Sequence, residues 1–140
     1  MSKTPFAHTP GFYTFAPQQT AEIANAARQQ ALPVLSASLA ACPTLPQALQ
    51  HLGEALAFPD WYGSNLDALY DCLCDPDWQP GNSLVLMLLG TAHLSLSDPK
   101  GFASLSEVLQ AAAEIRCDNG QRCWLLLDSP ATGIQPLSEA

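Results

Sequence analysis

The sequence predicts an α/β fold: a small parallel β-sheet packed with helices, with an extra βα unit at the N-terminal end. Short apolar runs bounded by turn residues alternate with longer segments whose apolar residues recur at helical spacing. The apolar run at residues 83–89 lacks polar alternation, which is typical of a strand buried on both faces of a parallel sheet. With 140 residues, 48% of them hydrophobic, the chain is long enough for one domain with a sizeable core.

The first half of the chain holds five expected elements. They are a strand at residues 11–15, a helix at 21–30, a strand at 33–39, a helix at 45–56 and a helix at 66–73. Thr20 is the expected cap of the first helix, and Thr44 precedes the second. Asn65 is the expected N-cap of the third helix, because the apolar stripe of that helix starts directly after it.

The second half completes the sheet. A strand at residues 83–89 is followed by a helix that starts at Asp98-Pro99 and runs to about Cys117, and then by a strand at 123–127. From residue 33 onward the order is therefore strand, helix, helix, strand, helix, strand. We expect one domain over residues 1–140, with an N-terminal extension at 1–32, a core at 33–129 and a flexible tail at 130–140.

Positive charge is absent from the middle of the chain. The Lys and Arg residues lie at positions 3, 28, 100, 116 and 122, and the formal net charge is -8. Such a chain attracts basic partners, and it lacks the basic stripe that direct binding of nucleic acid needs. An excess of acid also fits a role in solubility alone, so the local arrangement of the acids has to decide.

Cysteine use and hydropathy indicate the compartment. No apolar run approaches the roughly 20 residues needed to cross a bilayer, and the N-terminus lacks the pattern of a secretory leader. The 5 cysteines form an odd set without disulfide-framework spacing, which suits a reducing compartment. We therefore expect no membrane contact and a cytoplasmic location.

Two aspartates share one face of the helix expected at residues 66–73. Asp67 and Asp71 are one turn apart, beside the apolar stripe. A carboxylate in the first turn, such as Asp67, gains about 0.3–1 kcal/mol from the helix dipole, whereas Asp71 has no such benefit. Like charges one turn apart cost roughly a few tenths of a kcal/mol, so the pair becomes understandable if a cationic partner lies over both. The stripe itself consists of Leu66, Leu69, Tyr70 and Leu73.

Aromatic residues surround this helix. Trp61 and Tyr62 precede its turn, Tyr70 borders the acidic face, and Trp78 lies in the following loop. Such rings are common anchors of protein interfaces and are equally common in cores, so both interpretations stay open for each ring.

The motif PDWYGSNLDALYDCL at residues 59–73 resembles the barstar family, the intracellular inhibitors of barnase-like ribonucleases. The family pattern is P-[DE]-[YWF]-[YF]-G-x-N-x-D-A-L-x-D-x-L, and polar and apolar positions both agree. A weaker resemblance covers residues 33–129, including the acidic Glu114 and Asp118. The segment before residue 33 is similar to the extension of longer bacterial barstar-like proteins.

The resemblance implies an inhibitor of a basic extracellular-type ribonuclease or a related toxin. The helix aspartates would meet the arginines, lysine and histidine that hold RNA phosphates, with Asp71 at the energetic centre. Aromatic rings would contact the partner, a Gly-containing turn would support the helix, and an acid on the last helix would reach the partner's edge. No catalytic residue, metal or cofactor is implied. The implied partner-binding residues are Trp61, Gly63, Asn65, Asp67, Tyr70, Asp71 and Glu114.

Two departures from the family keep a second function open. Tyr70 stands where the family has a tryptophan, and the loop at residues 74–78 is longer than in the family. The alternative is an acidic protein-interaction module, or an immunity protein for a non-ribonuclease basic toxin or regulator.

Enzyme and metal sites have weaker support. Thiol catalysis would need a base beside Cys72 or Cys74, but no nucleophile signature surrounds either cysteine, and their spacing is not the C-x2-C of zinc sites. Asp67 and Asp71 lack a companion motif for metal binding or acid-base work. No glycine-rich phosphate loop is present.

Overall fold

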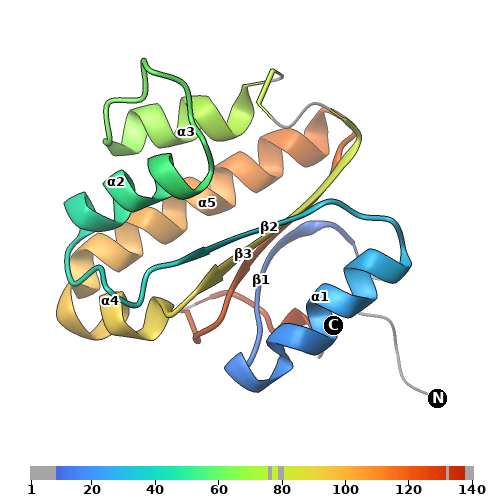
Figure 1. Cartoon of the computed structure of the whole chain (residues 1–140), viewed down its shortest axis with the longest axis horizontal. Helices are drawn as coiled ribbons and strands as arrows, with labels where there is room; N and C mark the ends of the chain where they lie inside the picture. Colours follow the sequence, from blue (N-terminus) through green and yellow to red (C-terminus); the bar gives the residue numbers. More distant parts are fainter. Residues whose placement is uncertain (1–8, 76, 79–80, 132, 138–140) are drawn as a thin grey trace.

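The computed structural model describes residues 9–75, 77–78, 81–131 and 133–137. Within them, a four-stranded parallel sheet has the order β1-β4-β3-β2, with helices on both faces (Figure 1). The predicted α/β class, small parallel sheet and N-terminal βα unit are confirmed. The strands are β1 Gly11–Thr14, β2 Val34–Ser38, β3 Ser83–Leu89 and β4 Arg122–Leu127.

The helices form two layers. In Figure 1, α2, α3 and α5 lie over one face of the sheet, whereas α1 lies over the other. The short α4 connects the end of β3 to the start of α5. The helices are α1 Thr20–Gln29, α2 Leu45–Ala55, α3 Leu66–Cys74, α4 Thr91–Ser97 and α5 Pro99–Asp118, and a short 3-10 helix, η2, spans Pro17–Gln19.

In the N-terminal βα unit, strand β1 extends the edge of the sheet and helix α1 covers the second face. Strand β1 pairs with β4, placing Gly11 opposite Trp124. On helix α1, Ile23 and Ala27 are buried in the same cluster as Trp124. The unit therefore adds an edge strand and covers apolar side chains of β3 and β4 that would otherwise face water. Residues 1–8 of the expected extension lie outside the described residues.

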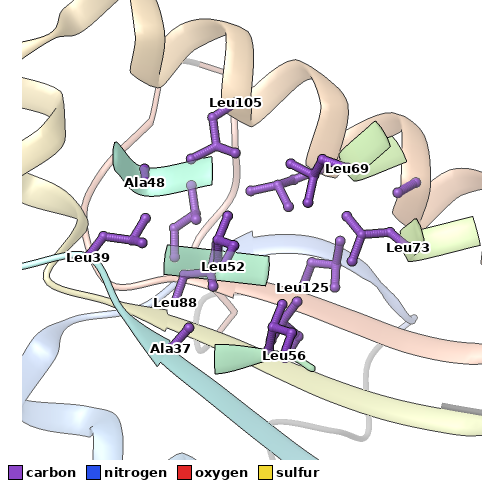
Figure 2. Close-up of a cluster of buried hydrophobic side chains, with 14 of the residues drawn as sticks. Ala37, Leu39, Ala48, Leu52, Leu56, Leu69, Leu73, Leu88, Leu105 and Leu125 are labelled. Carbon is purple, nitrogen blue, oxygen red and sulfur yellow. The ribbon is translucent and has the colours of Figure 1, made fainter. Parts of the chain in front are cut away.

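Strands β3 and β4 send alternate side chains into two cores. This explains the missing polar alternation at residues 83–89, because both faces of β3 are buried. Each large apolar side chain buried there contributes about 1.5–3 kcal/mol. Figure 2 shows the main core, where leucines of α2, α3 and α5 meet those of the sheet: Ala37, Leu39, Ala48, Leu52, Leu56, Leu69, Leu73, Leu88, Leu105 and Leu125 are labelled. The second core includes Phe15, Ile23, Val85, Met87, Trp124, Leu126 and Leu137.

Helix α4 was not predicted from the sequence. Its seven residues, TAHLSLS, are too few to show a helical period, and its start depends on a distant side chain. Gly90 adopts a left-handed φ of 66°, and the carboxylate of Asp128 accepts hydrogen bonds from the backbone N–H groups of Gly90 at 2.7 Å and Thr91 at 3.0 Å. A residue after β4 therefore caps the helix that follows β3, which local sequence cannot reveal.

The sequence predicted the starting residue of three helices besides α3, and two of these predictions are confirmed. Thr44 and Asp98 are N-caps whose side chains accept backbone hydrogen bonds. Thr20 is not a cap, and that prediction was wrong. It is the first residue of α1, its hydroxyl donates to the Pro17 carbonyl at 2.7 Å, and Gln19 takes the cap position because η2 runs directly into α1.

The described part of the C-terminal segment differs from the flexible tail expected at residues 130–140. Thr14 donates its backbone N–H to the Gln135 carbonyl at 2.9 Å, and Pro136 forms a parallel bridge with Thr14. Leu137 is fully buried in the second core. Residues 132 and 138–140 lie outside the described residues.

The C-terminal end of α2 has a residue in an unfavourable backbone conformation. Ala57 has a φ of 55°, its N–H donates to Glu54, and the N–H of Phe58 donates to the Gly53 carbonyl at 3.0 Å. This double hydrogen bond is the Schellman arrangement, whose left-handed position favours glycine. An alanine there costs about 1–2 kcal/mol.

Replacing Ala57 with glycine is therefore expected to stabilise the protein. We expect Ala57→Gly to raise the free energy of unfolding by about 0.5–1 kcal/mol, because relief of the left-handed strain exceeds the added entropy of the unfolded chain. Ala55→Gly, within the last turn of α2, is the matched control and should lower it by about 0.5–1 kcal/mol. Urea unfolding of both variants measures this, and a loss of stability in both would show that Ala57 is not strained.

Candidate functional site

Helix α3 starts from a tight turn that fixes its direction. The side chain of Asn65 accepts a hydrogen bond from the N–H of Ala68 at 2.8 Å, which confirms Asn65 as the N-cap. The left-handed residue of the turn is Ser64, with a φ of 53°, rather than Gly63. Gly63 has a different role, because a Cβ at that position would lie 3.0 Å from the Asn65 amide nitrogen. A side chain there would crowd the capping amide.

The C-terminal end of α3 is held by a buried arginine of α5. Arg116 is only 4% exposed and donates a hydrogen bond to the Leu73 carbonyl at 2.7 Å. Its guanidinium also lies 5.8 Å from the centre of the Trp78 ring. A cation at the negative end of a helix dipole is favourable, so Arg116 fastens α3 to α5. Its charge is directed at a backbone carbonyl and an aromatic ring.

Asp67 and Asp71 are both exposed on α3. Within the part of the chain that the structure describes, neither carboxylate has an ion-pair partner. The described arginines make their contacts elsewhere: Arg28 binds Asn25, Arg116 binds the Leu73 carbonyl, and Arg122 lies over the ring of Trp124. The negative charge of this helix face is therefore not neutralised by the arginines of the chain itself.

A hollow of about 470 Å³ lies between α3 and α5, and we call it the acidic hollow. Asp67 and Asp71 line one side, and Glu107 of α5 lines the other. Glu107 was not among the predicted binding residues, although it shares a helical face with Glu114, seven residues further along α5. Glu114 is exposed but does not line the hollow. The complete lining is Leu66, Asp67, Tyr70, Asp71, Glu107, Val108 and Ala111.

The aromatic residues divide between surface and core. Trp61 is 55% exposed, which makes it available to a partner. Tyr62 is anchored, since its hydroxyl donates to the Leu49 carbonyl at 2.6 Å. Trp78 is buried, and its indole N–H donates to the Leu56 carbonyl at 3.0 Å. Tyr70 is half-buried and lines the acidic hollow at its edge.

Burial changes the ionisation of groups beneath this face. It raises the pKa of the Tyr62 phenol to about 12 and, with help from nearby aspartates, that of the Cys72 thiol to about 11. Burial also raises the pKa of Cys74. These thiols are therefore protonated at neutral pH, which disfavours a nucleophilic role because the thiolate is the reactive form. All five cysteines are free.

Within residues 9–75, 77–78, 81–131 and 133–137, no group of three or more His, Cys, Asp or Glu side chains could hold a metal ion. In the same residues, no helix combines the length and apolar character that crossing a membrane requires.

Comparison with known proteins identifies a family. The model of the family described as "Barstar (barnase inhibitor)" matches residues 32–128, which is more than half of the 140-residue chain. The match includes α2, α3, α5 and three of the strands, and it leaves β1 and α1 outside. No curated protein matches the chain.

Because the pKa of Tyr62 is raised, the free energy of unfolding depends on pH in the alkaline range. The folded protein keeps the phenol proton up to about pH 12, whereas the unfolded chain loses it near pH 10.0, so this contribution is present below pH 10.0 and is lost as the pH rises through about 12. Tyr62→Phe should show a smaller loss of unfolding free energy across this window, and should cost about 1 kcal/mol at pH 7 through the lost hydrogen bond. Urea unfolding at several pH values measures the free energy of unfolding. An equal fall of this free energy with pH in the wild type and in Tyr62→Phe would contradict the prediction.

The anchoring role of Arg116 predicts a large loss on truncation. Arg116→Ala should lower the free energy of unfolding by about 2–4 kcal/mol, because it opens a cavity and leaves the Leu73 carbonyl without its donor. The exposed Arg122→Ala is the control and should cost no more than about 1 kcal/mol, the value of its contact with the Trp124 ring. Similar losses for both variants, measured by urea unfolding, would refute the anchoring role.

Proposed function

The chain belongs to the barstar family, and from this premise we propose that it inhibits a basic ribonuclease by laying the exposed face of α3 over the active site of that enzyme. The family is described by its inhibition of barnase. The observation that carries the proposal is the pair Asp67 and Asp71, exposed one turn apart and unpaired among the described residues.

The proposed mechanism is electrostatic mimicry of the substrate. A ribonuclease holds RNA phosphates with cationic side chains, and two carboxylates at fixed positions on a helix can take the place of those phosphates. Opposite charge also speeds the encounter of inhibitor and enzyme, with a dependence on salt. The net charge of -8 supports such steering. The inhibitor itself needs no catalytic group, metal or cofactor.

The other predicted residues would assist from the rim of this face. The exposed ring of Trp61 can pack on the partner, and Tyr70 can contact it from the edge of the acidic hollow. Gly63 and Asn65 would act indirectly, by shaping the turn that starts α3. Glu114, exposed on α5, would meet the periphery of the partner.

A second candidate partner is a basic toxin or regulator that is not a ribonuclease. One observation favours it: Trp78, in the loop after α3, is buried against Leu56 and Phe58 rather than offered to a partner. This loop is also longer than in the family, so a partner that reads it would meet a surface without the Trp78 ring. Pro76 of the same loop lies outside the described residues.

The proposed site of action is the cytoplasm. Five free thiols fit a reducing compartment, and an inhibitor that protects its own cell must meet the nuclease there. The proposal involves no membrane and no direct contact with nucleic acid.

Removal of one carboxylate tests the mechanism. We expect Asp71→Ala to weaken inhibition of a barnase-type ribonuclease by at least about 30-fold, since truncating one member of a buried charge pair costs about 2 kcal/mol or more. Glu22→Ala, which removes a carboxylate from α1 on the opposite face of the sheet, should inhibit like the wild type. Titration of ribonuclease activity with each protein measures this, and equal potency of wild type and Asp71→Ala would remove Asp71 from the mechanism.

A further inference from the structure

A second hollow adjoins the acidic hollow. It has a volume of about 580 Å³ and lies where the first turn of α2 faces the start of α3, and we call it the apolar hollow. Leu66 and Asp67 line both hollows, so they form the ridge between them. The lining of the apolar hollow is Leu45, Pro46, Leu49, Ser64, Asn65, Leu66 and Asp67.

The acidic hollow suits an arginine side chain of a partner. Its three carboxylates come from two helices, with Asp67 and Asp71 on α3 and Glu107 on α5, and no Lys or Arg is among its lining residues. Apolar side chains such as Val108 form the rest of the wall and reduce the local exposure to water. A guanidinium group donates in several directions in one plane, so it can reach carboxylates on both sides of the hollow.

The apolar hollow suits an uncharged side chain. Leu45, Leu49 and Leu66 supply most of its wall, and its single charged residue is Asp67 on the ridge. The carboxamide oxygen of Asn65 is already engaged, since it accepts the hydrogen bond that caps α3. An apolar or aromatic group would bury hydrocarbon surface there at about 25 cal/mol per Å².

Building on the proposed function, we propose that the partner fills both hollows at once, with an arginine in the acidic hollow and a neighbouring apolar side chain in the apolar hollow. The binding surface then extends from α3 to Glu107 of α5 on one side and to Pro46 of α2 on the other. Charge complementarity selects a basic protein, and the shared ridge requires the two inserted side chains to be neighbours on the partner's surface. Neither Glu107 nor Pro46 belongs to the binding set that the motif implies.

Two substitutions test the two hollows separately. Glu107→Lys reverses one charge of the acidic hollow, and Pro46→Trp fills the apolar hollow from an exposed position. We expect each to weaken binding to a barnase-type ribonuclease by at least about tenfold, measured by calorimetry and by inhibition titration. Glu22→Lys on α1 and Gln47→Trp, beside Pro46 but outside both linings, are the matched controls and should bind like the wild type.

The outcomes separate this inference from the proposed function. If the wild-type protein neither binds nor inhibits the ribonuclease, the proposed function fails. If the wild type inhibits but Glu107→Lys or Pro46→Trp binds as tightly as its control, the two-hollow surface is overturned and the proposed function stands. Circular dichroism confirms folding of each variant, and Glu107→Gln and Pro46→Phe replace any variant that does not fold.

Discussion

The contact on which the candidate site depends is the attachment of α3 to α5 by Arg116. This buried guanidinium donates to the Leu73 carbonyl and lies over the ring of Trp78, so its charge stabilises the C-terminal end of α3. A buried cation is expensive to desolvate, and pairing it with a carboxylate is the usual solution. Here the carboxylates of α3 instead stay on the exposed side of the helix, which leaves Asp67 and Asp71 able to interact with another molecule.

The opposite end of α3 is equally constrained. Asn65 caps the helix, Gly63 leaves room for the capping amide, and Tyr62 fixes the preceding segment to the Leu49 carbonyl of α2. A helix fastened at both ends presents its aspartates in one orientation before any partner arrives. Binding then requires little ordering of the inhibitor, which favours affinity because less conformational entropy is lost. The exposed Trp61 stands directly beside the anchored Tyr62, so its ring is offered from a fixed backbone.

The sequence revealed the fold because its local signals and its burial pattern agree. The apolar run of β3, the N-cap Asn65 and the leucine stripe of α3 each have a local cause that the sequence shows. Helix α4 and the packed Leu137 depend on distant residues: Asp128 caps α4, and the second core encloses Leu137. Glu107 was missed for the same reason. Its helical face could be predicted, but its position across a hollow from α3 follows only from the packing of α3 on α5.

The central claim is that α3 carries negative charge to be neutralised by a cationic partner. The most direct measurement is the dependence of the association rate constant on ionic strength, followed by stopped-flow mixing with a barnase-type ribonuclease. The account predicts a steep fall of the rate constant with added salt for the wild type, and a much shallower fall for the double variant Asp67→Asn/Asp71→Asn. Equal salt dependence for the two proteins, with both folded, would contradict it.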